Sequence, residues 1–355
     1  MLRACIAVGL IVCGALLLNH NLYPQQPAST PSQTLRANVD LVSVYFTVRD
    51  SRGRLLPDLR REDFRVFEDG KEQPIGFFAH HSDVLLNIGV LLDTSTSMRP
   101  LLETEANAAA YFFQSVMRPA DLGFAVSYNA RVEVLQVPTD QVDLLAQKTD
   151  TIRRYGKYDQ APSSPPASTF PPVIFRKPQT YPQPVPGPGG PDPDLRIAKL
   201  YDAVTLSVSR FLEREAGRKA MLILALADDA KSEASLEQAL RALKRSETIA
   251  YVVEVEHAPR AQRDDCDILH IFHDDLKLRI GRLAEETGGR VIRVKGFDKL
   301  KAAFEDISKE LHNQYSLGYT PPNPEWDGAL HRIEIRTKTK SYRVYARDGY
   351  YAVRP

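Results

Sequence analysis

The clearest pattern along the chain is a series of apolar runs separated by segments with helical periodicity. Residues 85–92 are almost continuously apolar, as expected of a strand that is buried on both faces. Residues 122–128 form a second such run. Between them, apolar residues recur at helical spacing, at Leu102, Ala106, Ala109, Phe113 and Val116. This stretch therefore predicts a strand, a helix and a strand.

The same alternation resumes after residue 195. It predicts strands over 220–226, 249–255 and 290–294, and helices over 197–212, 236–243 and 300–311. A further helix, which contains Ile280 and Leu283, should end at Gly288-Gly289, because glycine is the usual stop after a helix. Strands that alternate with helices favour an α/β fold with a Rossmann-like, doubly wound and mostly parallel sheet.

Both ends of this region have a β pattern without helices. Residues 38–82 contain two short apolar strands with a turn at Glu68-Asp69-Gly70, and residues 315–355 contain alternating apolar and charged residues. Neither segment is able to bury a face alone. We therefore expect the two to pack together as a small β module that flanks the α/β domain of residues 83–314.

The first residues form a pattern of their own. Arg3 precedes an apolar run from Ala4 to Leu18, which is about the length of a signal-peptide core and short for a membrane-spanning helix. No small-residue cleavage site of the usual kind follows. Residues 1–28 are thus predicted to be a signal peptide or an uncleaved N-terminal anchor, and residues 29–37 a linker. An exported protein of the periplasm, cell envelope or medium is expected, in contact with a membrane only through an uncleaved leader.

Composition narrows the choice of partner and marks one insertion. The chain has 355 residues, with 46 Lys and Arg against 45 Asp and Glu, and no long basic run, so nothing favours a nucleic-acid partner. Residues 155–195 hold 12 of the 25 prolines. Their apolar residues have no period, which predicts an extended proline-rich insertion within the α/β domain.

The candidate chemistry lies directly after the first buried strand, at Asp93-Thr94-Ser95-Thr96-Ser97. In an open α/β sheet, ligand sites lie beyond the carboxyl ends of the strands, where we expect Asp93 to face solvent. A carboxylate and two hydroxyls at positions i, i+2 and i+4 can converge on a hard cation such as Mg²⁺. The same five residues by themselves also fit a simple helix N-cap. The buried strand before them and the repeating β/α series favour the cation site.

The order and spacing of several motifs resemble the von Willebrand factor A (VWFA) family, and within it a bacterial subgroup called acidobacterial VWFA-related proteins. The resemblance covers residues 38–352 and is carried by Val48-Arg49-Asp50, Glu62-Asp63-Phe64, Phe67-Glu68-Asp69-Gly70, Asp93 to Ser97, Leu200-Tyr201-Asp202-Ala203, Thr287-Gly288-Gly289 and Gln314 to Tyr319. It implies a metal-ion-dependent adhesion site (MIDAS) at the top of the sheet. Ser95 and Ser97 would then contact the metal directly, and Asp93 would act mainly through water.

Two further elements that the resemblance implies depart from the family pattern. Asp228 follows the next central strand, but Asp229 stands where the family usually has glycine. The threonine expected after Gly189-Gly190 is replaced by Pro191, and Asp192 or Asp194 could substitute for it. The resemblance implies Mg²⁺, or Mn²⁺ or Ca²⁺ in its place, and a protein partner that offers an acidic side chain.

Other constellations are weaker. Cys266, His270 and His273 would share one helix face and suit zinc or copper, but the family has a loop there, and incidental histidines are common in loops. The usual motifs of nucleophilic, nucleotide-binding and metalloprotease enzymes are missing, so we expect no enzyme. Two hypotheses remain: an adhesion or envelope-assembly protein that binds its partner through the metal site, and a structural envelope module whose site is vestigial and metal-free.

Overall fold

A computed structural model describes residues 41–81, 84–157, 198–225, 232–255, 279–295, 297–321 and 327–352. The leader and most of the proline-rich insertion, from residue 158 on, lie outside these ranges. Among the described residues, no helix is both long enough and apolar enough to cross a membrane.

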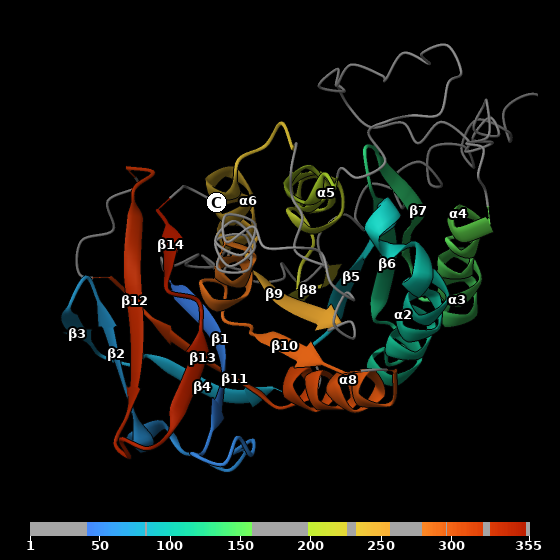
Figure 1. Cartoon of the computed structure of the whole chain (residues 1–355). Coiled ribbons are helices and arrows are strands. Elements are labelled where there is room, and N and C mark those ends of the chain that lie inside the picture. The colour runs from blue at the N-terminus through green and yellow to red at the C-terminus, as the bar shows by residue number, and fades with distance from the viewer. Residues whose placement is uncertain are drawn as a thin grey trace, which may run out of the picture. The chain divides into compact units, whose positions relative to one another are not determined.

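A six-stranded sheet lies at the centre of the α/β domain, in the order β10-β9-β8-β5-β6-β7 (Figure 1). Its strands are β5 (Leu86–Asp93), β6 (Leu122–Tyr128), β7 (Val132–Thr139), β8 (Arg218–Ala225), β9 (Thr248–Val255) and β10 (Val291–Val294). All neighbours pair in parallel except β6 and β7, which are antiparallel. The doubly wound, mostly parallel sheet predicted from the sequence is confirmed. The antiparallel edge strand β7 was not predicted.

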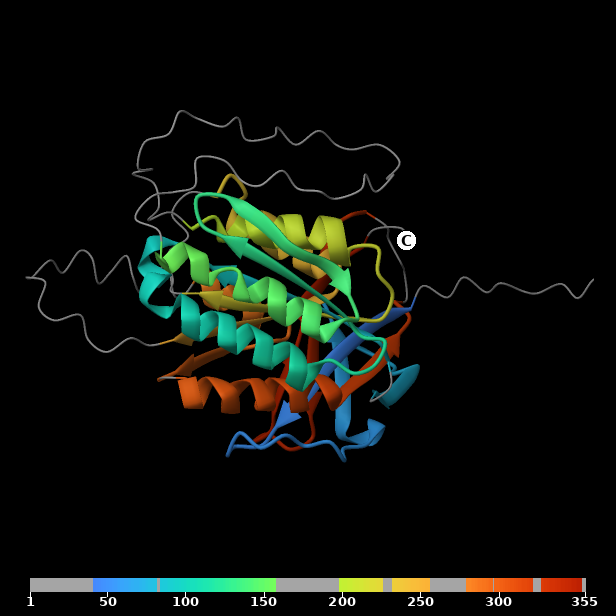
Figure 2. The same cartoon turned by 90° about the vertical axis from the view of Figure 1, so that its right-hand side faces the viewer.

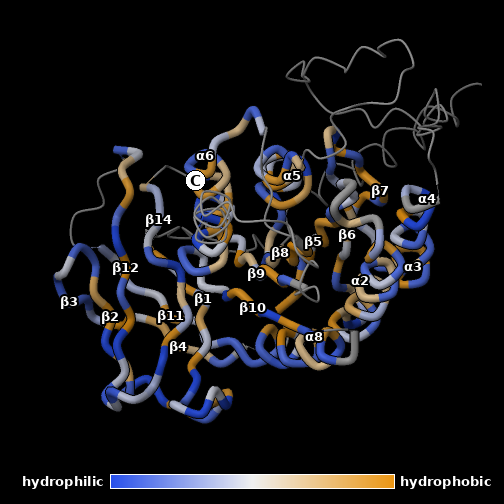
Figure 3. Tube along the Cα trace, in the orientation of Figure 1, coloured by the Kyte–Doolittle hydropathy of each residue, from blue (hydrophilic) through white to orange (hydrophobic). Residues whose placement is uncertain are grey.

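Helices cover both faces of this sheet (Figure 2). They are α2 (Leu102–Val116), α3 (Val142–Asp150), α4 (Arg153–Lys157), α5 (Leu200–Ser207), α6 (Leu236–Arg245) and α8 (Phe297–His312), with a π-helical turn η3 (Val208–Leu212) after α5 and a helix over residues 279–285. Alternate residues of β5 face opposite layers. Ile88 and Val90 pack in the core with α2 and α8, and Leu91 packs in the core with α5 and α6. Figure 3 shows the resulting apolar central strands, and this two-sided burial explains their continuous apolar runs.

The β module consists of two four-stranded antiparallel sheets, in the orders β13-β1-β11-β4 and β14-β12-β2-β3. Its strands are β1 (Val42–Arg49), β2 (Phe64–Glu68), β3 (Lys71–Gln73), β4 (Phe77–His81), β11 (Gln314–Tyr319), β12 (Leu330–Thr337), β13 (Arg343–Ala346) and β14 (Gly349–Tyr351), with a short 3-10 turn η1 (Arg61–Asp63) before β2. In both sheets, N-terminal strands pair directly with C-terminal strands. The expected β module is thus confirmed, and the two ends of the chain share each of its sheets.

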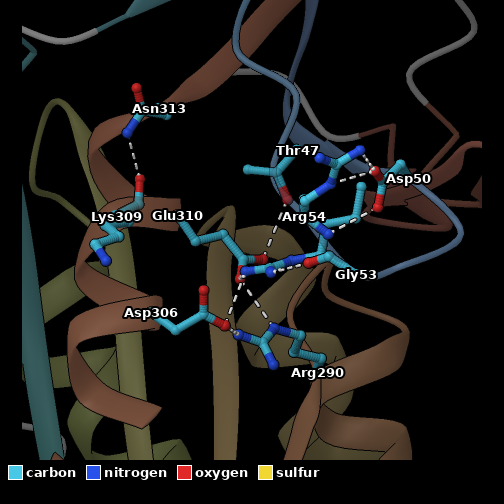
Figure 4. A network of polar contacts seen from close by, with 10 residues as sticks. Thr47, Asp50, Gly53, Arg54, Arg290, Asp306, Lys309, Glu310 and Asn313 are labelled. Carbon is cyan, nitrogen blue, oxygen red and sulfur yellow. Dashed lines mark hydrogen bonds and ion pairs between the residues drawn. The ribbon is translucent and has the colours of Figure 1, made fainter. Parts of the chain in front are cut away.

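A buried charge network joins the β module to helix α8 and the central sheet (Figure 4). The Glu310 side chain of α8 is fully buried. It accepts hydrogen bonds from Arg49 of β1 at 2.8 Å, from Arg290 at 2.9 Å and from the Thr47 hydroxyl at 3.1 Å. Asp306, one turn earlier, also pairs with both arginines. Because a buried carboxylate needs partners of this kind, the network fixes how the two parts of the chain dock.

The predicted boundaries differ from the structure in a few places. The helix predicted over 197–212 is α-helical from Leu200 and becomes π-helical at Val208. The first three residues of the predicted insertion, 155–157, belong to helix α4. Helices α3 and α4 were not predicted, because their apolar stripes are short.

Candidate functional site

The predicted site begins at Asp93, the last residue of β5. This strand lies in the middle of the sheet, and the chain continues from it to β6 on one side and later returns as β8 on the other. Such a change of direction is the topological switch point, where ligands of open α/β sheets bind. The structure therefore places Asp93 where the fold class favours a binding site.

The Asp93 carboxylate is held against its own turn. Its Oδ1 accepts a hydrogen bond from the backbone N–H of Ser95 at 2.9 Å. Asp93 and Ser95 are each only 2% exposed, and Thr94 between them is 4% exposed. The expectation of a solvent-facing Asp93 was wrong, because the turn folds back on the strand end instead of extending into solvent.

Glu105 of helix α2 lies directly behind this turn and was missed from the sequence. Its Oε1 accepts the backbone N–H of Asp93 at 2.8 Å, whereas its Oε2 is buried without a hydrogen bond among the described residues. Burial, reinforced by the nearby Asp93 charge, raises the pKa of Glu105 well above its ordinary value. The available signal was a glutamate within the apolar stripe that contains Leu102, Ala106 and Ala109.

Neighbouring strand ends hold the turn in place. The Thr94 N–H donates to the Tyr128 carbonyl at 2.8 Å, and the Asn129 amide donates to the Thr94 hydroxyl at 3.0 Å. The Tyr128 hydroxyl donates to the carbonyl of Leu224 in β8 at 3.0 Å. The Lys199 N–H, just before helix α5, donates to the Asn129 carbonyl at 2.9 Å. Four chain segments are thus tied together at one edge of the sheet.

Asp202 of the Leu-Tyr-Asp-Ala motif has a structural role in this arrangement. Its carboxylate accepts the backbone N–H groups of Glu233 at 3.1 Å and Ala234 at 2.8 Å. In return, the Ser232 hydroxyl accepts the N–H groups of Tyr201 at 3.0 Å and Asp202 at 3.2 Å. These reciprocal bonds fix the start of α5 to the residues that precede α6. Asp202 therefore anchors the connection between β8 and α6.

Only part of the predicted ligand set falls within the described residues. Asp93 and Ser95 are adjacent at the strand end. The backbone of Ser97 lies in the 3-10 helix η2 (Thr96–Leu101), but its side chain is outside the described part. Asp228, Asp192 and Asp194 also lie outside it, as do Cys266, His270 and His273. Whether these residues converge with Asp93 stays a prediction.

Comparison with known proteins finds no matching family model and no matching curated protein. Among solved structures, the chain is similar to proximal thread matrix protein 1 from the mussel byssus, in a form with a zinc-occupied MIDAS motif, with 13% identity and a TM-score of 0.43. The similarity covers 68% of this chain and half of the mussel protein.

Two further solved structures are shorter and nearly fully covered. BatB from Bacteroides thetaiotaomicron is 13% identical with a TM-score of 0.36, covering 64% of this chain and 98% of BatB. The VWA domain of SpRpn10 is 11% identical with a TM-score of 0.34, covering 62% and 94% of the two chains. At these values, the fold assignment rests on the sheet topology of the chain itself.

Proposed function

We propose that this chain is a protein-binding module that holds a divalent cation at the carboxyl end of β5. The position of Asp93 at the switch point of the sheet carries the proposal. A carboxylate there can serve a ligand that approaches between the loops of neighbouring strands. The bonds from Glu105 and Tyr128 hold the turn that carries this carboxylate.

The described donors fit a hard cation. Asp93 offers a carboxylate and Ser95 a hydroxyl, and Mg²⁺ prefers oxygen ligands and keeps several waters. Burial and the nearby Asp93 charge raise the pKa of Glu105, and Glu105 contributes to the site by holding the Asp93 backbone N–H. In the proposal, Ser97 and Asp228 complete the set, Asp192 or Asp194 stands in for the missing threonine, and Mn²⁺ or Ca²⁺ can replace Mg²⁺.

The proposed ligand is an acidic side chain of a protein partner. A site with few charged protein ligands leaves the cation attractive to a further carboxylate oxygen, which is the hard donor that it prefers. We propose binding and not catalysis. In support, the sequence carries no G-x-S-x-G, P-loop, H-E-x-x-H or C-x-x-C motif, the usual motifs of several enzyme classes.

We also propose that the protein works outside the cytoplasm, as an adhesion or envelope-assembly component. The support is the charged and then apolar pattern of residues 1–28, which is typical of an export signal. A reporter fused after Gln33 should reach the periplasm or the medium, and its retention in the cytoplasm would contradict this part of the proposal.

The metal site is tested by titrating the full chain with Mg²⁺ and with Mn²⁺ in a calorimeter. Asp93→Asn keeps the size of the side chain and an acceptor for the Ser95 N–H but removes the charge. It should weaken Mg²⁺ binding at least about tenfold, which corresponds to ~1.4 kcal/mol.

A matched control is Asp121, which directly precedes β6 and contacts the opposite end of β5. Asp121 is also buried, and its carboxylate accepts the backbone N–H groups of Leu86 and Arg118, each at 2.8 Å. Asp121→Asn should leave Mg²⁺ affinity unchanged. If Asp93→Asn and Asp121→Asn bind Mg²⁺ as tightly as the unmodified chain, the site is vestigial and the protein is a structural envelope module.

A further inference from the structure

An imidazole and two carboxylates meet in the β module, away from the β5 turn. Glu68 is the last residue of β2, Asp69 follows it in the turn, and His331 is the second residue of β12. One ligand atom from each of the three side chains lies within 4.8 Å of the other two. His331 Nδ1 is 2.9 Å from Asp69 Oδ2 and 3.8 Å from Glu68 Oε1.

These separations are close to the distances between neighbouring ligand atoms in a zinc site. Zinc binds histidine nitrogen and carboxylate oxygen at about 2.0–2.2 Å in a tetrahedron, so neighbouring ligand atoms lie about 3.3–3.5 Å apart. The two separations from His331 Nδ1 fall on either side of this value. Shifts of about half an ångström would bring both His331 distances to this value, and the two carboxylate oxygens lie within 4.8 Å of each other.

Asp69 and His331 are held in place by the pairing of their strands. The Asp69 N–H donates to the Arg332 carbonyl, and the Arg332 N–H donates to Asp69 Oδ1, both at 2.9 Å. Asp69 Oδ2 is thereby directed to the imidazole. The His331 ring stacks on Tyr350, with ring centres 5.5 Å apart and planes at 26°. The two ligands are thus positioned before any ion arrives.

Glu68 supplies an independent sign that a cation belongs here. Its side chain is only 10% exposed, and its Oε2 accepts the hydroxyls of Tyr319 at 2.6 Å and Tyr350 at 3.3 Å. Its Oε1 makes no hydrogen bond within the described residues and is directed toward His331. The hydrogen-bond partners of this carboxylate are thus two neutral hydroxyls, and a cation beside it would compensate its largely buried charge.

The other imidazole nitrogen fits the same interpretation. His331 Nε2 is buried and has no hydrogen bond in the described part of the chain, and Asp327 Oδ1 lies 3.9 Å away. A histidine that binds metal through one nitrogen usually donates its other N–H to a carboxylate, which fixes the ring. Asp327 is half-exposed and can approach to hydrogen-bonding distance.

We propose that Glu68, Asp69 and His331 form a zinc site in the β module, with Asp327 as the outer partner of the histidine. Three protein ligands leave the fourth position of the tetrahedron for water or for a donor from another molecule. The imidazole distinguishes this site from the all-oxygen set at Asp93, because nitrogen donors suit zinc and not magnesium. The inference is independent of the function proposed above.

The test is a calorimetric titration of the metal-stripped full chain with zinc chloride, in the presence of excess Mg²⁺. His331→Gln and Glu68→Gln should each weaken one zinc-binding event at least about tenfold, and zinc should raise the urea midpoint of the unmodified chain more than that of either variant. Glu68→Gln keeps an acceptor for the two tyrosines, so it guards against a loss caused by misfolding.

Two control variants separate this site from others. His80→Gln removes an exposed histidine from the same module and should leave zinc binding unchanged. Asp93→Asn should lose the Mg²⁺ response and retain the zinc event, so the two proposals fail separately. Unchanged zinc affinity in both His331→Gln and Glu68→Gln, or displacement of the zinc by Mg²⁺, would overturn the assignment.

Discussion

Replacing Glu310 by glutamine removes the central charge of the network that joins helix α8 to the β module. Glutamine has nearly the same shape, so packing is retained while the negative charge is lost. After the substitution, Arg49 and Arg290 face an uncharged amide. Their side chains are only 8% and 18% exposed. The NH2 group of the glutamine would also take the place of one carboxylate oxygen, and it is not able to accept the hydrogen bonds that this oxygen accepts.

The expected cost follows from the burial of the remaining charges. Removing one partner of a buried ion pair typically costs about 3–5 kcal/mol, because the other charge stays buried and uncompensated. Asp306 still contacts both arginines, and its side chain is 42% exposed. This second carboxylate compensates part of the charge, so we expect Glu310→Gln to lower the free energy of unfolding by about 3 kcal/mol.

The assay is urea unfolding followed by far-ultraviolet circular dichroism at neutral pH. The matched control is Glu334→Gln on β12, because Glu334 also pairs with an arginine, Arg336, but both side chains are more than half exposed. Exposed pairs contribute little, so this control should change the midpoint far less. Equal losses in the two variants would refute the reasoning, since burial of the network would then add nothing.

Two more variants probe the packing and the pH dependence of the fold. A Cβ atom on Gly289 would lie 1.9 Å from the Ala250 carbonyl oxygen. Gly289→Ala should therefore lower the free energy of unfolding by about 1–3 kcal/mol in the same urea assay. The control is Gly281→Ala, which should not destabilise the fold, because the nearest neighbour of its Cβ atom would be 3.7 Å away. Burial raises the pKa of Glu286, but the hydrogen bonds that Glu286 accepts from Lys244 and Arg282 outweigh burial and lower this pKa below 4.5. The ionised Glu286 therefore stabilises the fold above about pH 4.5, and this contribution is lost as the pH falls through the lowered pKa. The stability margin of the unmodified chain over Lys244→Met should shrink over that range, and a margin independent of pH would contradict the role of Glu286.

The sequence by itself determined the fold class and the start of the candidate site. A strand buried on both faces is apolar at nearly every position, so β5, β6, β8 and β9 were visible as near-continuous apolar runs. The same run ends at Asp93, which placed a carboxylate at the carboxyl end of a central strand. Strand β7 was not predicted because it has no continuous apolar run: Leu135 is its only buried apolar residue, and Val137 is exposed at the sheet edge.

Only the tertiary structure decided which distant residues meet. Glu105 reaches Asp93 across a turn and the start of α2, Arg49 meets Glu310 across 261 positions, and His331 meets Asp69 across 262. Hydrophobic periodicity reports local burial, because it depends on the repeat of a single helix or strand. It carries no information about the register between strands far apart in the chain. That register, together with the docking of α8 on the β module, placed the buried carboxylates beside their partners.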